Sequence, residues 1–260
     1  MSWSSIELPG AEVSIAPDWL QPEQADALFA DLRQSVPWGM HRIKLFGREV
    51  DSPRLSCWIG DADAGYTYSG TRFEPHAWPE ALVPIRDRLI NEIGIDFNSV
   101  LANLYRDGAD CMGWHSDNEA ALGSQPVIAS LSLGAVRRFV FKRRSEDQTP
   151  NPHPPFGHPL PLRRRGETAQ LHPGAPSSRR RETAQSCGQA SAPLLRSGRG
   201  VGVRVCDRTN ASDSKRTLEL PHGSLLVMRG GTQRNYRHAL PRTTKPTGAR
   251  INLTFRRVRG

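Results

Sequence analysis

Residues 99–117 read SVLANLYRDGADCMGWHSD, a run of strand-forming residues followed by a short turn and a His-x-Asp tripeptide. The run from Ser99 to Tyr105 is rich in β-formers. If the tripeptide is extended, His115 and Asp117 point to the same side, because side chains alternate along a strand. The stretch therefore predicts a β-structure that delivers one imidazole and one carboxylate to the same place.

Further strand-forming runs follow along the chain, separated by turn residues. They are Val127 to Leu133, Val136 to Lys142, Ser224 to Arg229 and Arg250 to Arg257. Several short antiparallel strands in about 150 residues most economically form a jelly roll or a barrel, because these arrangements leave few sheet edges open.

Two helices are expected before these strands. In Pro22 to Gln34, apolar residues recur at helical spacing behind a proline that suits the first turn. A second helix is expected within Pro79 to Ile93, with Gly94 as its stop signal, although Pro84 could instead mark its beginning. Helices first and strands afterwards predict an α+β fold.

The composition changes between Ser145 and Arg216. This stretch holds nine Pro, seven Gly and few large apolar residues, and RRRGETAQ at 163–170 is nearly repeated as RRRETAQ at 179–185. We interpret residues 145–216 as a disordered, low-complexity basic insertion within a single domain spanning residues 1–260. A long loop costs little closure entropy when its ends are neighbouring strands, so the fold should survive it.

The composition of the whole chain narrows its class. Hydrophobic residues make up 37% of the 260 residues, and the sequence shows neither a run of about 18 apolar residues nor a signal-peptide pattern. We expect an intracellular protein, cytoplasmic or, in a eukaryote, nuclear, without membrane association. The four cysteines form no C-x-x-C pair, which argues against a structural zinc site and a disulfide scaffold.

A surplus of basic residues favours a polyanionic partner such as nucleic acid. The formal net charge is +9, from 35 Lys+Arg against 26 Asp+Glu. Residues 145–216 contain 12 of these bases and six of the acids, so they supply six of the nine surplus charges. The insertion is therefore either a solvated spacer or a basic arm that holds nucleic acid.

A third ligand would turn His115 and Asp117 into a metal site. His238, in NYRHALP beyond the insertion, is the leading candidate among the remaining histidines. Two histidines and one carboxylate form a facial triad, which suits Fe(II) because one face of the metal stays open for a co-substrate and oxygen. A His-x-Asp tripeptide is common without any metal, so the rest of the sequence has to support this interpretation.

The last strand-forming run, RINLTFR at 250–256, supports it. Arg250, Asn252, Thr254 and Arg256 alternate with apolar residues. Arginines on the inner face of a barrel would be costly buried charges unless an anion meets them. Six steps of roughly 3.3 Å place the two Cα atoms about 20 Å apart, and two extended arms leave a gap of about 6–8 Å, which a five-carbon diacid fills. The alternative is an exposed edge strand whose arginines face water.

Four segments resemble, in order, the motifs of the AlkB family of Fe(II)/2-oxoglutarate dioxygenases, which repair alkylated bases. They are NLYRDGADCMGWHSDNE at 103–119, PVIASLSLGAVRRFVFK at 126–142, LELPHGSLLVMRGGTQRNYRHALP at 218–241 and RINLTFR at 250–256. The similarity runs from about Arg42 to Val258 without the insertion. It implies a double-stranded β-helix, which is a variant of the jelly roll.

The resemblance also implies the ligands and the reaction. His115, Asp117 and His238 would hold iron. The reaction would use O2 and the co-substrate 2-oxoglutarate. The residues that would bind 2-oxoglutarate are Asn103, Tyr105, Arg250, Asn252 and Arg256, and its far carboxylate would contact Arg250 and the Tyr105 hydroxyl. The implied activity is oxidative demethylation of 1-methyladenine and 3-methylcytosine in DNA, with formaldehyde, succinate and carbon dioxide as products. The alternatives are the same chemistry on RNA, protein or a small molecule, or nucleic-acid binding through the insertion.

A methyl group on the Watson–Crick edge is hidden in a duplex, so the base must be flipped out and held between flat groups. Residues 53–70 resemble the family's nucleotide-recognition lid, with Tyr66 and Tyr68 at the base-contacting positions. Either Tyr68 or Trp58 could stack on the base, although a Y-x-Y pair is ordinarily a packed strand. Glu119 matches a family position that faces the base, and its alternative is an ordinary solvated acid.

Phe46 is the candidate wedge that fills the gap left by a flipped base. Leu45-Phe46-Gly47 precedes Pro53-Arg54 at the spacing that duplex-acting relatives use for such a finger. Phe46 could equally pack in the core of a hairpin. We expect a monomer that acts on alkylated nucleic acid.

Overall fold

Antiparallel strands form the framework of the computed structural model, which describes residues 2–45, 48–68, 71–144, 205–206 and 215–259. The strands of the larger sheet are β1 (Ser4–Ile6), β2 (Glu12–Ala16), β5 (Leu55–Gly60), β8 (Ser99–Tyr105), β10 (Ile128–Gly134), β14 (Ser224–Arg229) and β16 (Arg250–Arg256). The strands of the smaller sheet are β9 (Met112–His115), β11 (Arg137–Arg143), β12 (Val205–Cys206), β13 (Lys215–Leu220) and β15 (Tyr236–Leu240).

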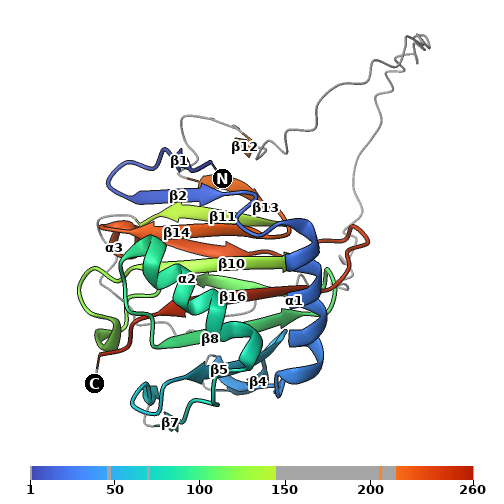
Figure 1. Ribbon diagram of the computed structural model, residues 1–260. Coiled ribbons are helices and arrows are strands. Elements are labelled where there is room, and N and C mark those ends of the chain that lie inside the picture. Colours follow the sequence, from blue (N-terminus) through green and yellow to red (C-terminus); the bar gives the residue numbers. More distant parts are fainter. Residues whose placement is uncertain (1, 46–47, 69–70, 145–204, 207–214, 260) are drawn as a thin grey trace, which may run out of the picture. The chain divides into compact units, whose positions relative to one another are not determined.

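The strand order brings the sequence-distant parts of the chain together (Figure 1). The larger sheet has the order β1-β2-β14-β10-β16-β8-β5, and the smaller sheet has the order β12-β13-β11-β15-β9. Apolar side chains of both sheets, among them Leu101 and Leu226 of the larger and Phe141 and Leu218 of the smaller, form one buried cluster. The two sheets therefore pack face to face, as the jelly-roll prediction requires.

The period-2 alternation predicted for the last strand is present in β16. Its Ile251, Leu253 and Phe255 join the buried cluster that also contains the helices, whereas Arg250 and Arg256 belong to the opposite face. β16 lies between β10 and β8, with pairs such as Asn252 to Ser132 and Asn252 to Asn103. The alternative of an exposed edge strand is therefore wrong.

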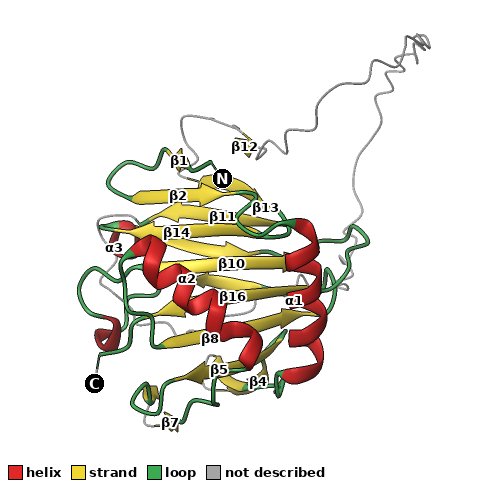
Figure 2. Cartoon of the chain, in the orientation of Figure 1, coloured by secondary structure: helices red, strands yellow, loops and turns green. Residues whose placement is uncertain are grey.

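Both predicted helices are present, and they cover the outer face of the larger sheet (Figure 2). α1 (Pro22–Ser35) begins at the predicted proline, and α2 (Val83–Ile93) ends at Gly94, whose φ of 76° is the left-handed conformation typical of a helix stop. The turn η1 (Glu80–Leu82) precedes α2, so Pro84 stands in the first turn of the longer helix. None of the described helices combines the length and apolarity needed to cross a bilayer.

Two hairpins carry the residues predicted for substrate contact. β3 (Arg42–Leu45) pairs with β4 (Arg48–Asp51), and Phe46 lies outside the described residues between them. β6 (Tyr66–Tyr68) pairs with β7 (Thr71–Phe73), so the Y-x-Y segment is a strand, as its pattern suggests. Each hairpin is a separate two-stranded sheet beside the two large ones.

Most of the predicted insertion lies outside the described residues, which include only Val205–Cys206 and Lys215–Arg216 of it. β12 pairs with β13 through Val205 to Leu218, and β13 begins at Lys215. The predicted end at Arg216 is therefore two residues too late, and Val205–Cys206 belongs to the sheet rather than to a disordered loop. Lys142 of β11 pairs directly with Lys215, so the described strands on either side of the insertion are neighbours. A long loop joining such neighbours costs little closure entropy.

Candidate metal centre and co-substrate pocket

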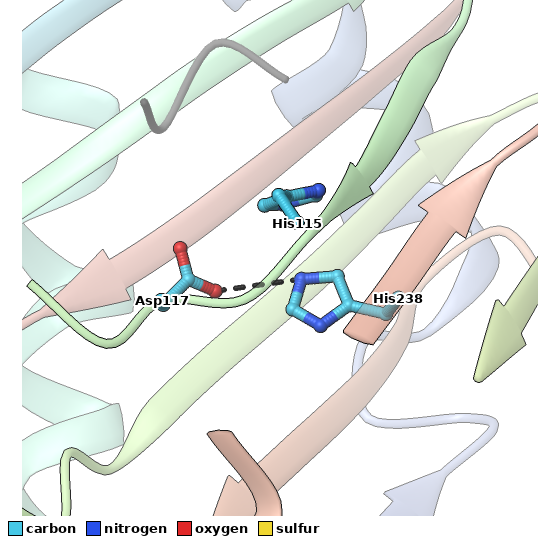
Figure 3. Close-up of side chains that lie close together, drawn as sticks. All are labelled: His115, Asp117 and His238. Carbon is cyan, nitrogen blue, oxygen red and sulfur yellow. Dashed lines mark ion pairs between the residues drawn. The ribbon is translucent and has the colours of Figure 1, made fainter. Parts of the chain in front are cut away.

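His115, Asp117 and His238 come together beside β15 and β9, the last two strands of the smaller sheet (Figure 3). His115 ends β9 and lies directly opposite His238 in β15, and Asp117 follows two residues later. One ligand atom from each residue lies within 4.8 Å of the others, and His238 Nε2 is 3.5 Å from Asp117 Oδ2. The predicted convergence of residues from either side of the insertion is confirmed.

Hydrogen bonding and burial prepare His115 as a neutral metal ligand. Its Nδ1 lies 2.9 Å from the Gly113 carbonyl, which can only accept, so Nδ1 carries the proton and Nε2 keeps its lone pair. Burial, followed by the charge of His238, lowers the pKa of His115 to about 3. Burial disfavours the charged imidazolium, and the ring is therefore neutral at physiological pH.

Asp117 is held as a carboxylate by its neighbours. Burial alone would raise its pKa, but the charge of Arg256 and the contact with His238 outweigh burial and hold the pKa well below its ordinary value. Arg256 donates a hydrogen bond to Oδ1, and the Asp117 backbone N–H donates to Gln233 Oε1 at 3.0 Å. The carboxylate is therefore ionised and oriented from two sides.

These three residues fit a divalent iron. They offer two imidazole nitrogens and one carboxylate, the set that suits Fe(II) with open coordination positions. Asp117 Oδ2, which faces His238, is buried and accepts no hydrogen bond from the described residues. A buried carboxylate oxygen in that state favours a bound cation.

A pocket lies beside the triad. The predicted co-substrate residues Tyr105, Asn252 and Arg256 line it together with the three metal ligands. Burial raises the pKa of Tyr105, so its hydroxyl stays protonated and can donate a hydrogen bond. These three residues and the metal ligands therefore line one pocket, and binding of 2-oxoglutarate by the predicted residues stays a prediction.

Arg250 is a buried cation next to this pocket. Its side chain is 0% exposed, and it pairs in register with Tyr105. Its Nη2 donates to Ser132 Oγ at 2.7 Å, and no carboxylate of the described residues pairs with it. Burial lowers its pKa to about 10, so it stays charged at neutral pH. A buried charge without a counter-ion is costly, and an anion in the pocket would offset that cost.

The two arginines of β16 differ in their partners. Arg256 is bound to Asp117, whereas the described partners of Arg250 are neutral. The sequence predicts that one diacid meets the buried charges of both Arg250 and Arg256. This expectation needs correction, because Asp117 already pairs with Arg256 and only Arg250 lacks a described acid. The physical reason is that the loop after β9 places a protein acid beside Arg256.

The residues predicted for base contact differ from one another in their surroundings. Glu119 is 8% exposed, so its alternative as a solvated acid is wrong, and burial together with the charge of Asp117 raises its pKa to about 7. Trp58 is 5% exposed and its indole N–H donates to the Ala64 carbonyl at 3.1 Å. Tyr66 and Tyr68 are described as strand backbone. Stacking on a base stays a prediction for all three aromatic residues.

Sequence reasoning missed three residues that organise the site. Gln233 holds the backbone of Asp117, Ser132 accepts a hydrogen bond from Arg250, and Arg54 donates to Asn103 Oδ1 at 2.7 Å. A signal existed for Ser132, because Ser130 and Ser132 alternate with Leu residues and so mark the polar face of a strand. Gln233 and Arg54 act over 116 and 49 residues of sequence, where no local pattern applies.

Comparison with solved structures shows the fold. The structure entitled "The structure of OsALKBH1" matches with a TM-score of 0.53 and 13% sequence identity, and the match covers 98% of this chain and 100% of that chain. At this identity the likeness concerns the fold alone. It confirms the predicted α+β fold with a double-stranded β-helix.

Comparison with known sequences shows the family. Residues 12–256 match the family described as 2OG-Fe(II) oxygenase superfamily. The chain is 32% identical over 255 residues to "DNA oxidative demethylase ALKBH2" of Arabidopsis thaliana, covering 96% of this chain and 67% of the relative. It is 30% identical over 260 residues to the human protein of the same name, covering 99% and 77%.

A second group of relatives has a different name. The chain is 30% identical over 249 residues to "Alpha-ketoglutarate-dependent dioxygenase alkB homolog 3" of Bos taurus, covering 95% of this chain and 66% of the relative. It thus spans about two thirds of the length of the first relatives it matches. Fe(II) and 2-oxoglutarate are the cofactors, because the family match coincides with the His115, Asp117 and His238 triad. The chain is therefore a dioxygenase that belongs to the AlkB family.

Proposed function

We propose that the protein oxidatively demethylates 1-methyladenine and 3-methylcytosine in DNA. The observation that carries the proposal is Glu119, a buried carboxylate close to Asp117 whose oxygens accept no hydrogen bond from another described residue. Both methylated bases are cationic near neutral pH and carry an exocyclic amine. A cationic base beside Glu119, whose pKa is raised to about 7, would favour the ionised carboxylate that suits it. The relatives named DNA oxidative demethylases support the same substrate class.

The co-substrate would lie between the triad and Arg250. Arg250 would bind one carboxylate of 2-oxoglutarate, with the Tyr105 hydroxyl as a second donor, and Asn103, Asn252 and Arg256 would complete the site. Iron, when bound, supplies the oxidation of the N-methyl group at the expense of O2 and 2-oxoglutarate, giving formaldehyde, succinate and carbon dioxide. The sheets bury these groups, which strengthens each electrostatic contact.

The decisive experiment is formaldehyde release from methylated oligonucleotides in the presence of Fe(II), ascorbate and 2-oxoglutarate. We expect release from DNA that contains 3-methylcytosine or 1-methyladenine, in amounts that match succinate. Unmethylated DNA is the control, and methylated RNA, a methylated peptide and free methylated nucleosides are the competing substrates. Succinate formation that methylated DNA does not stimulate, together with stimulation by another substrate, would overturn the proposal.

The same assay separates catalysis from simple nucleic-acid binding through the basic insertion. A variant in which a short Gly-Ser linker replaces residues 146–203 keeps the paired strands β11 and β13. Demethylation should largely survive in that variant and vanish in His115→Ala. The opposite pattern, in which His115→Ala retains the function and the shortened chain loses it, would favour a binding protein that acts through its insertion.

Glu119 provides a test of how the substrate is recognised. A hydrogen bond to a charged group contributes about 1.5–3 kcal/mol, so Glu119→Ala should lower kcat/KM for 3-methylcytosine by about tenfold to a hundredfold. The kcat/KM for the neutral base 3-methylthymine should fall much less, because this base forms no charge pair with Glu119. Succinate formation without nucleic acid is the control for an intact metal centre. An equal loss for the two bases would contradict a charge-reading role of Glu119.

A further inference from the structure

We propose that Arg54 is a positioning residue for 2-oxoglutarate, because it sets the orientation in which the Asn103 amide meets the co-substrate. The inference deepens the proposed function and rests on the assignment of Asn103 to the co-substrate site. Arg54 directly precedes β5 and is 0% exposed. Leu55 pairs with Leu104, so Arg54 lies beside the end of β8 that carries Tyr105.

The hydrogen bonds of Arg54 leave one orientation for the amide. Its Nε donates to Asn103 Oδ1 at 2.7 Å, and its Nη1 donates to Ser52 Oγ at 3.2 Å. A guanidinium group has only donors, and a side-chain amide has one acceptor oxygen and two N–H donors. If the amide were flipped, its NH2 group would meet the Arg54 N–H donor. A hydrogen bond from a charged donor is also roughly twice as strong as one from a neutral donor, so Arg54 determines the orientation of the Asn103 amide.

This orientation leaves the donor side of Asn103 for a ligand. Asn103 is fully buried, and its Nδ2 has no hydrogen-bond partner among the described residues. Ser56, which pairs in register with Asn103, is also fully buried, and its Oγ likewise has no hydrogen-bond partner among the described residues. Asn252, on the other side of Asn103, lines the pocket beside the triad. Two neighbouring unsatisfied groups that can donate suit an acceptor-only ligand such as 2-oxoglutarate.

The charge of Arg54 acts in the same direction. Arg54 and Arg250 both lower the pKa of Tyr105 by their charges, although burial keeps the net shift upward. Both cations therefore lie close to the phenol that is expected to contact the co-substrate. Their combined positive potential favours a dianion over a neutral molecule in the pocket.

The test measures binding of 2-oxoglutarate by calorimetry to the full chain loaded with Ni(II), without nucleic acid. Arg54→Met should weaken binding by about tenfold, because the amide is no longer held. Asn103→Asp should weaken it at least as much, because it keeps an acceptor for Arg54 and removes the Nδ2 donors. Arg54→Lys, which retains a charged donor, should restore most of the affinity. Arg143→Met, at an exposed position of β11, is the control.

A double-mutant cycle separates positioning from a general structural role. If Arg54 acts through Asn103, the variant carrying both Arg54→Met and Asn103→Ala should bind 2-oxoglutarate about as weakly as Asn103→Ala alone. Ni(II) affinity and melting temperature should follow the control variant. Additive losses, or unchanged 2-oxoglutarate binding in Arg54→Met, would overturn the proposal. If Arg54→Met does not fold, the variants Arg54→Lys and Asn103→Asp test the proposal instead. The proposal is wrong if Asn103→Asp binds 2-oxoglutarate as tightly as the unaltered chain.

The outcome is independent of the substrate assignment. Binding is measured before any methylated base is added, so a chain that fails to demethylate DNA can still show the Arg54 effect. Conversely, active demethylation with an unchanged 2-oxoglutarate affinity in Arg54→Met would remove this inference and leave the proposed function intact.

Discussion

His115→Ala is expected to lower succinate and formaldehyde formation by more than about a hundredfold. Loss of groups that merely orient a metal ligand typically costs about 10- to 100-fold in affinity or activity, and loss of the ligand itself should exceed that. His115 is buried, neutral and fixed by the Gly113 carbonyl, so alanine removes a prepared nitrogen donor. Anaerobic titration with Fe(II) should show the corresponding loss of metal binding.

A matched control uses another histidine. His76 is exposed, so His76→Ala should leave metal binding and turnover unchanged. His238→Ala should resemble His115→Ala, and the double variant should be little worse than either single one, because ligands of one metal act as a unit. Metal binding that persists at full strength in both single variants would exclude the triad as the iron site.

Arg250→Met is expected to raise the KM for 2-oxoglutarate by about a hundredfold. Truncation of one partner in a buried, hydrogen-bonded charge pair costs about 2–5 kcal/mol, and each 1.4 kcal/mol is tenfold in affinity. The effect should be large here because no described carboxylate pairs with Arg250, so the far carboxylate of the co-substrate would be its counter-ion. The measurement is succinate formation over a range of 2-oxoglutarate concentrations at saturating Fe(II).

The stability of the same variant distinguishes binding from a structural role. A buried charge without a counter-ion is costly, so replacing Arg250 by an apolar side chain of similar length removes that cost and leaves no buried acid unpaired. We therefore expect Arg250→Met to melt near the temperature of the unaltered protein when 2-oxoglutarate is absent, while 2-oxoglutarate stabilises it much less. Arg138→Met, at an exposed position of β11, should keep both properties. A large loss of stability with an unchanged KM would show that Arg250 serves the fold alone.

Local patterns predicted the helices α1 and α2 and five of the described strands, namely β8, β10, β11, β14 and β16. β8 and β14 have the bounds expected from their runs of β-formers, α1 begins at Pro22, and the alternation in β16 separates its apolar from its polar face. These features depend on side-chain periods of two or 3.6 residues and on the conformations of single residues. Both can be recognised in a short stretch of sequence. The family motifs likewise predicted the three metal ligands.

Pairing over long sequence distances decides the rest of the site. The amino-acid order does not indicate that Arg256 meets Asp117 while no described acid meets Arg250, or that Arg54 contacts Asn103. Nor did composition reveal that Lys215 already belongs to a strand, because its partner is Lys142 on the far side of the insertion. Which charges are compensated depends on neighbours supplied by other strands, and these neighbours exist only once the two sheets have closed on each other.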